Sequence, residues 1–191
     1  NQYPNNFYIV EEYVEHDIEM SISYMVNHDK VLPVCLVFDD NRLFPMGLGP
    51  KMDAGELIVA GVPKFFDDIF TEKIKKWTSK VGYVGWLDVD FGMTKNGDYK
   101  IFEFMCRFGH PSACTMMKLA CCDWADIFYR FLHGEHITQE DFQWKHKYAF
   151  SIGMFTMSTQ NNSFTGPLPV GEKILNYEEY FKKSSKDQSK H

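Results

Sequence analysis

Residues 85–106 read GWLDVDFGMTKNGDYKIFEFMC, and this stretch decides the fold. The pair Asn96-Gly97 lies between two runs that are rich in apolar residues. An Asn-Gly pair in that setting is the strongest short signal for a β-hairpin. The sequence therefore predicts two antiparallel strands, one over 85–93 and one over 98–106.

The turn also sets which residues of the two strands face each other. A two-residue turn pairs Lys95 with Asp98, and counting outward then places Asp90 opposite Glu103. Side chains alternate between the two faces of a strand pair. One face is therefore expected to carry Trp86, Asp88, Asp90, Glu103, Met105 and Arg107. The other, the expected core face, carries Leu87, Val89, Phe91, Met93, Phe102, Phe104 and Cys106.

Asp90 and Glu103 would lie side by side with like charges, which destabilises a strand pair. Full solvation, a shared proton or a cation could offset this repulsion. Mg²⁺ prefers oxygen ligands and often binds one or two carboxylates together with substrate phosphates. Arg107 on the same face suits a phosphate or a carboxylate. A solvated, charged outer face is the alternative that the hairpin pattern leaves open.

The rest of the chain carries signals for both helices and strands. Strands are expected over 7–14, 18–26, 31–38 and 148–157, and helices over 64–80 and 112–133. Pro33 interrupts its strand, which indicates an edge strand or a bulge. The segment 39–63 is rich in Gly and Pro and is expected to be one long loop. The pattern as a whole predicts an α+β fold.

The composition excludes several classes of protein. The chain has 191 residues, 45% of them hydrophobic and 16% aromatic, which is enough for a packed core. Its formal net charge of -6 argues against a nucleic-acid partner, and no apolar run is long enough to span a membrane. Five cysteines without a C-x-x-C pair favour a reducing, cytoplasmic location. Because the chain begins with Asn1, we expect a piece of a longer polypeptide.

Several motifs resemble those of the ATP-grasp ligases, most closely the glycinamide ribonucleotide synthetase (phosphoribosylamine–glycine ligase) family. Residues 103–111 read EFMCRFGHP, which is similar to that family's EFNCRFGDPE. Residues 9–14, followed by Glu19, look like its adenine hinge and ribose-binding acid. Gly49-Pro50 falls where the family has a substrate loop. Residues 148–171 look like the opening of its C-terminal domain.

The resemblance implies an ATP-grasp catalytic subdomain over 1–145, with an antiparallel sheet and packed helices. Residues 146–191 would begin the following C-terminal domain and its tail. The implied activity is ATP-dependent carboxylate–amine ligation through an acyl phosphate, as in purine biosynthesis. The implied cofactors are ATP and Mg²⁺, or Mn²⁺ in its place. The implied partners are an amine and a carboxylate, with neither nucleic acid nor membrane.

The resemblance also carries nucleotide and substrate positions onto this chain. Glu11 would face the adenine amino group, the backbone of Val14 would bind the ring edge, and Glu19 would hold the ribose hydroxyls. The substrate loop would include Gly49, Pro50 and Lys51.

By the same resemblance, Asp90 and Glu103 would bind Mg²⁺, and Arg107 would be the catalytic contact to phosphate or acyl phosphate. Met105 departs from the family pattern, because it replaces an Asn metal ligand and a thioether is a poor ligand for a hard cation. His110 replaces an Asp. These departures leave two alternatives: an ATP-grasp ligase with a different amine and acid, and a degenerate protein that binds nucleotide or a partner without catalysis.

Overall fold

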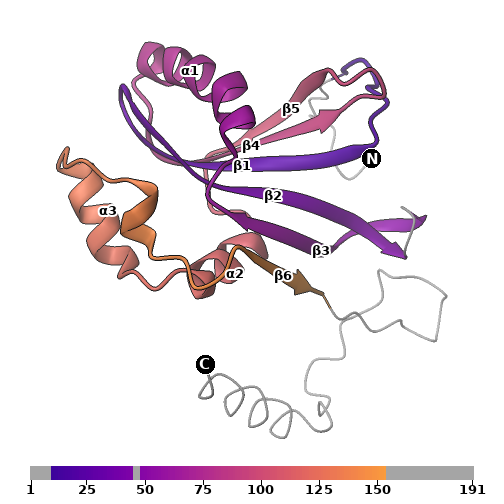
Figure 1. The fold of residues 1–191 in the computed structure, drawn as a ribbon. Coiled ribbons are helices and arrows are strands. Elements are labelled where there is room, and N and C mark those ends of the chain that lie inside the picture. Colours follow the sequence, from indigo (N-terminus) through magenta and orange to yellow (C-terminus); the bar gives the residue numbers. More distant parts are fainter. Residues whose placement is uncertain (1–9, 45–47, 154–191) are drawn as a thin grey trace, which may run out of the picture. The chain divides into compact units, whose positions relative to one another are not determined.

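The computed structural model describes residues 10–44 and 48–153, with the backbone alone for 41, 43, 44 and 50–54. The strands are β1 (Ile18–Asn27), β2 (Lys30–Phe44), β3 (Leu48–Ala60), β4 (Val84–Met93), β5 (Tyr99–Met105) and β6 (Tyr148–Ile152). The helices are α1 (Lys64–Val81), α2 (Ser112–Leu119), α3 (Trp124–Leu132) and the short 3-10 helix η1 (Gln139–Phe142). The strands form an antiparallel sheet in the order β5-β4-β1-β2-β3-β6 (Figure 1). The predicted α+β class is confirmed.

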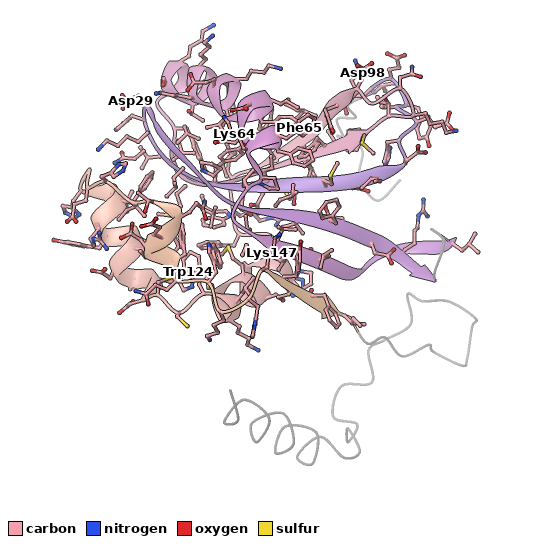
Figure 2. All side chains as sticks on the ribbon, viewed as in Figure 1. Asp29, Lys64, Phe65, Asp98, Trp124 and Lys147 are labelled. Atoms are coloured by element: carbon pink, nitrogen blue, oxygen red, sulfur yellow. The ribbon has the colours of Figure 1, made fainter. Side chains whose placement is uncertain are left out.

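Helices cover the sheet on both faces, with α1 on one side and α2 and α3 on the other (Figure 1). The core under α1 includes Ile22, Leu36, Phe70, Ile74, Leu87, Val89 and Phe91. The core under α2 and α3 includes Met25, Val37, Ile58, Met116, Ile127 and Phe131. Side chains fill the space between the sheet and each helical layer (Figure 2). Because the middle of β1 is buried on both faces, Ser23 is only 3% exposed, although the alternating sequence predicted a half-buried strand.

Helix α1 is confirmed almost to the residue, because its sequence signals are local. Pro63 precedes its first turn, where a missing N–H costs nothing, and Gly82 ends it with φ 67°, in the left-handed region that favours glycine. Phe70 and Ile74 are buried against the sheet. Trp77 lies at the margin of the helix, where its ring stacks on Phe104 of the edge strand β5 with centroids 4.7 Å apart.

The β4–β5 hairpin is confirmed, but its turn is longer than predicted. Met93 pairs with Tyr99, and the turn closes through Gly97, whose φ is 81°. A bulge then shifts the register between Asp90 and Phe91, so that Asp90 again faces Glu103. The two deviations cancel, which is why the predicted carboxylate pair is correct although the predicted turn is wrong.

The bulge also moves one aromatic side chain to the other face. Phe102, predicted for the core face, lies against Gly92 and His16 instead. A Cβ on Gly92 would sit 2.4 Å from the Phe102 ring, so only glycine leaves room there. Phe104 keeps its predicted face but is 41% exposed, and Cys106 is also exposed, because β5 is the last strand of the sheet.

The long loop predicted over 39–63 is wrong. The chain continues β2 to Phe44 and returns as β3 from Leu48, and β6 pairs with the other side of β3. β3 pairs with β2 from Leu48 to Val59 and with β6 from Gly55 to Val59, so long-range strand pairing overrides the local propensity of its Gly and Pro residues. Gly49, Pro50 and Lys51, predicted to lie in a substrate loop, therefore belong to a strand.

Three further predictions need correction or refinement. The single helix predicted over 112–133 is two helices, because Asp123 accepts hydrogen bonds from the backbone N–H groups of Ala125 and Asp126 and so starts α3. The strand predicted over 7–14 is wrong where the structure describes it, since 10–14 has no regular secondary structure. Pro33 lies at a bulge in β2, which is an interior strand and not an edge.

The last described strand, β6, belongs to the main sheet. It covers 148–152 of the strand predicted over 148–157, whose remaining part after 153 lies outside the described residues. The chain divides into two compact units, 1–153 and 154–191. The domain boundary predicted between residues 145 and 146 stays a prediction. None of the described helices is long and apolar enough to cross a membrane.

Candidate active site

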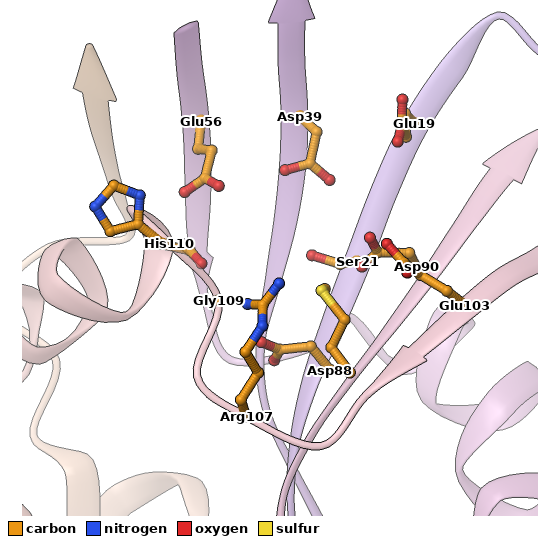
Figure 3. Close-up of a pocket in the computed structure, with 12 residues that line it drawn as sticks. Glu19, Ser21, Asp39, Glu56, Asp88, Asp90, Glu103, Arg107, Gly109 and His110 are labelled. Carbon is orange, nitrogen blue, oxygen red and sulfur yellow. The ribbon is translucent and has the colours of Figure 1, made fainter. Parts of the chain in front are cut away.

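A pocket opens on the sheet face opposite α1, beside the part that α2 and α3 cover (Figure 3). Strands β1 to β5 supply most of its lining, and the loop between β5 and α2 and the first residue of α2 supply the rest. The lining residues are Glu19, Ser21, Asp39, Glu56, Asp88, Asp90, Glu103, Met105, Arg107, Gly109, His110 and Ser112.

Strand register arranges the acidic side chains of this pocket in two rows. Glu19 pairs with Asp39, and Asp39 pairs with Glu56, so one row crosses three strands. In the second row, Asp90 lies between Ser21 on β1 and Glu103 on β5. Together with Asp88 the pocket holds six carboxylates against one guanidinium, that of Arg107. Such a surplus of negative charge creates a potential that attracts cations.

Asp88 is the most enclosed carboxylate of the pocket, with 2% of its surface exposed. The indole Nε1 of Trp86 donates to Asp88 Oδ1 over 2.9 Å. Burial raises the pKa of Asp88 to about 6, although Trp86 and the nearby polar groups of Ser23, the Gly109 backbone and Arg107 lower it. Burial is therefore the dominant influence on this group.

Arg107 and His110 reach the pocket from the loop between β5 and α2 (Figure 3). Arg107 is exposed, and its Nη1 donates to the Phe108 carbonyl over 3.0 Å. Gly109 follows, packed so closely that a Cβ there would lie 2.9 Å from Asp88 Oδ2. The sequence predicted a site role for Arg107, which the loop holds at the mouth of the acidic pocket.

The structure brings four of the predicted site residues into this pocket: Glu19, Asp90, Glu103 and Arg107. Glu11 and Val14 are not among its lining residues; Glu11 is exposed, and the Val14 carbonyl lies 3.0 Å from His16 Nδ1. Gly49 and Pro50 are also absent from the described lining, as is Lys51. Their predicted roles in nucleotide and substrate binding stay predictions.

Sequence reasoning missed Asp39 and Glu56 as members of the site. Both lie in the segment 39–63, which the sequence predicts as a loop, so no strand register could be assigned to them. The available signal was the acidic residue two positions from a buried apolar residue in each strand, Val37 on β2 and Ile58 on β3. That spacing places the acid and the apolar residue on one face.

The donor set of the pocket fits a hard divalent cation only in part. Carboxylate oxygens are the ligands that Mg²⁺ prefers, and Asp90 and Glu103 face each other across two strands. Among the side chains that the structure describes, however, no group of three or more His, Cys, Asp and Glu is arranged to hold a metal alone. The arrangement matches a Mg²⁺ ion that is bound by two protein carboxylates, with phosphate and water as its remaining ligands. Mg²⁺ usually keeps several ligands that do not come from the protein.

The chain is similar in sequence to phosphoribosylamine–glycine ligases, although it matches no family model. It is 24% identical over 155 residues to the Escherichia coli O157:H7 enzyme, covering 76% of this chain and 35% of that protein. It is 31% identical over 93 residues to the Methanosarcina barkeri enzyme, covering 46% and 21%. The chain thus spans about a third of the length of the first of these curated relatives.

Solved structures with the same fold are ATP-grasp enzymes. Phosphoribosylamine–glycine ligase from Thermotoga maritima superposes with a TM-score of 0.62 at 20% identity, over 80% of this chain and 39% of that one. A Hydrogenobacter thermophilus biotin carboxylase domain, crystallised with MgADP and bicarbonate, superposes with a TM-score of 0.52 at 14% identity, over 73% and 30%. The predicted resemblance and the ATP-grasp fold are confirmed.

Proposed function

We propose that this chain forms the metal- and nucleotide-binding part of an ATP-dependent carboxylate–amine ligase that resembles phosphoribosylamine–glycine ligase of purine biosynthesis. The observation that carries the proposal is the opposed pair Asp90 and Glu103, set beside Arg107 in a strongly acidic pocket of an ATP-grasp fold. ATP would supply the phosphoryl group that activates a carboxylate for attack by an amine. The location would be the cytoplasm.

The acidic pair would hold Mg²⁺, the cation that offsets phosphate charge in such reactions. Asp90 and Glu103 repel each other without a cation, so binding one relieves a strain that the strand register imposes. Arg107, on the loop above them, would contact a phosphate or acyl-phosphate oxygen through charge-assisted hydrogen bonds. These side chains position and stabilise charge, which is most of what a protein contributes to phosphoryl transfer.

Glu19 would bind the ribose hydroxyls of ATP. Its carboxylate lies in the same pocket as the acidic pair, and His16 Nε2 lies 3.9 Å from Glu19 Oε2. Glu11 and the backbone of Val14 would contact the adenine from the segment that leads into β1. Gly49, Pro50 and Lys51 would contact the acceptor substrate from the far end of β3.

Two observations favour alternatives to a phosphoribosylamine–glycine ligase. His110 lines the pocket where the resembling family has an Asp, which favours a ligase with a different amine and acid. Met105 faces Asp88 in the pocket, and a thioether there favours a nucleotide-binding protein without catalysis.

Incubation of the full-length protein with ATP, Mg²⁺ and candidate pairs of amines and carboxylates tests the proposal. The expected result is release of ADP and phosphate that requires both an amine and an acid. ATP binding by calorimetry without ADP release from any pair would support the degenerate alternative. Absence of both ATP binding and ADP release would overturn the proposal.

A further inference from the structure

The loop over 106–111 connects β5 to α2 and rests on a buried carboxylate. Arg107 and His110 on this loop line the pocket, and Asp88 lies on β4 beside the loop with its carboxylate turned toward it (Figure 3). Arg107 is exposed, whereas Asp88 is 2% exposed. The loop thus has a solvent side, which carries Arg107, and a sheet side, which contacts Asp88.

Asp88 contacts both the sheet and the loop. Trp86 Nε1 on β4 donates to Asp88 Oδ1 over 2.9 Å, and Ser23 pairs with Asp88 in the register of β1 and β4. On the loop side, the Gly109 backbone lies close enough to Asp88 to lower the pKa of its carboxylate. Asp88 therefore links the loop to two strands of the sheet.

Gly109 shows how closely the loop is seated on this carboxylate. A Cβ at position 109 would lie 2.9 Å from Asp88 Oδ2 and 2.4 Å from Ser112 Oγ. The Gly109 carbonyl accepts from the Ala113 N–H over 3.1 Å, at the beginning of α2. Any side chain at 109 would push the loop away from Asp88, and the start of α2 would move with it.

We infer that Asp88 is a positioning residue that holds the loop over 106–111, and with it Arg107 and His110, at the pocket. The effects of this inference on kcat rest on the proposed function. The contact between Asp88 and Gly109 does not depend on that function. Asp88 also faces Met105 in the strand register, where an extra carboxylate could serve as a metal ligand in place of the family's Asn. The hydrogen bond that it accepts from Trp86 and its close approach to Gly109 favour the positioning role.

The first test compares Asp88→Asn with the parent in the full-length protein. The amide keeps the side-chain volume, but its NH₂ group cannot accept, so a group that donates to that oxygen loses its partner. We expect kcat to fall about tenfold or more, because the contact that seats the loop loses a hydrogen bond to a charged group. The Mg²⁺ concentration for half-maximal rate should stay within about twofold, because a positioning residue does not touch the metal.

Gly109→Ala provides a matched second variant on the other side of the contact. It should lower kcat as Asp88→Asn does, and the double variant should be little worse than either, because residues in one contact are not additive. Asp88→Asn could instead need a tenfold higher Mg²⁺ concentration, and adding Met105→Asn to it could restore the parent's requirement. That result would assign Asp88 to the metal and overturn the inference. A kcat within about twofold of the parent would also overturn it.

The second test does not depend on activity. Amide hydrogen exchange at Gly109 should be slow in the parent and about tenfold faster in Asp88→Ala, which removes the acceptor. Amides of Val89 and Phe91 report whether the sheet stays folded, and Asp88→Leu, which also has no acceptor but fills more of the space, provides a second variant if Asp88→Ala does not fold. Unchanged exchange at Gly109 in a folded variant would overturn the inference. If the parent has no ligase activity, this measurement still tests the contact and separates its failure from that of the proposed function.

Discussion

The sheet face opposite α1 has two halves that are made from the same strands and differ in what covers them. In the half under α2 and α3, β2 contributes Val37 and β3 contributes Ile58, both buried. Two residues along, on the same face, β2 contributes Asp39 and β3 contributes Glu56 to the pocket. Strand alternation therefore selects the face, and helix coverage decides which half becomes core and which becomes site.

The largest effect should come from the open half. Asp90→Asn or Glu103→Gln should abolish ATP-dependent turnover, because losing a direct ligand exceeds the about 10–100-fold that an outer-shell partner costs. Without metal, each variant should fold normally or gain about 0.2–1 kcal/mol, because a directly opposed like-charge pair disappears. ADP release and thermal melting measure the two effects.

Asp98→Asn is the matched control for that prediction. Asp98 is an exposed carboxylate at the far tip of the same hairpin, away from the pocket (Figure 2). The turnover and the Mg²⁺ dependence of Asp98→Asn should equal those of the parent. Parent-like activity in Glu103→Gln would mean that the open half is only a charged, solvated face.

The covered half should respond in stability and not in metal dependence. Ile58 is fully buried, so Ile58→Ala should lower the free energy of unfolding by about 2–5 kcal/mol. Denaturant unfolding without Mg²⁺ measures this loss, and the Mg²⁺ concentration for half-maximal rate should not change. A loss below about 1 kcal/mol would mean that α2 and α3 do not pack on this half as described.

Asp88 lies where the halves meet and should make stability depend on pH. Burial raises its pKa from 3.8 to about 6, so the folded state binds more protons between these values and loses stability as pH rises. Asp88→Asn has no carboxyl group at this position and therefore does not lose this stability. The free energy of unfolding of Asp88→Asn minus that of the parent should rise by about 3 kcal/mol between pH 3.5 and pH 7. Denaturant unfolding across this range measures the difference, and a constant difference would contradict the raised pKa.

Glu19 should give the smallest effect, confined to nucleotide binding. Charge-assisted hydrogen bonds to ribose hydroxyls contribute about 1.5–3 kcal/mol, so Glu19→Ala should weaken ATP binding about tenfold or more. Calorimetry measures the dissociation constant. Glu56→Gln, in the same row of acids, serves as the comparison and should leave ATP affinity within about twofold. An unchanged constant in Glu19→Ala would reject the ribose role.

Local signals in the sequence predicted the elements that local chemistry determines. Asn96-Gly97 identified the hairpin, and the helix predicted over 64–80 from its apolar spacing is α1. The pairing of Asp90 with Glu103 was also predicted, although it depends on a bulge that no residue type in the sequence indicates. The hairpin pattern placed Arg107 on the same face, and the resemblance to ATP-grasp ligases supplied Glu19; both residues line the pocket together with that pair.

Long-range pairing determined what the sequence did not reveal. The strand β3 is rich in Gly and forms because β2 and β6 pair with it, and β6 lies some 90 residues later in the chain. The row from Glu19 through Asp39 to Glu56 depends on that pairing, so it could not be predicted while 39–63 was read as a loop. The break before α3 was within reach, because Asp123 is a favourable helix N-cap.

Metal binding by Glu103 tests the central claim most directly, with Mn²⁺ as a spectroscopic substitute for Mg²⁺. Mn²⁺ would be titrated into the full-length protein with a non-hydrolysable ATP analogue and followed by electron paramagnetic resonance. We expect the parent and Asp98→Asn to bind Mn²⁺ with the same affinity. In Glu103→Gln the affinity for Mn²⁺ should be lower by about tenfold or more. Mn²⁺ binding in Glu103→Gln equal to that of the parent would contradict the assignment of the open half as the metal site.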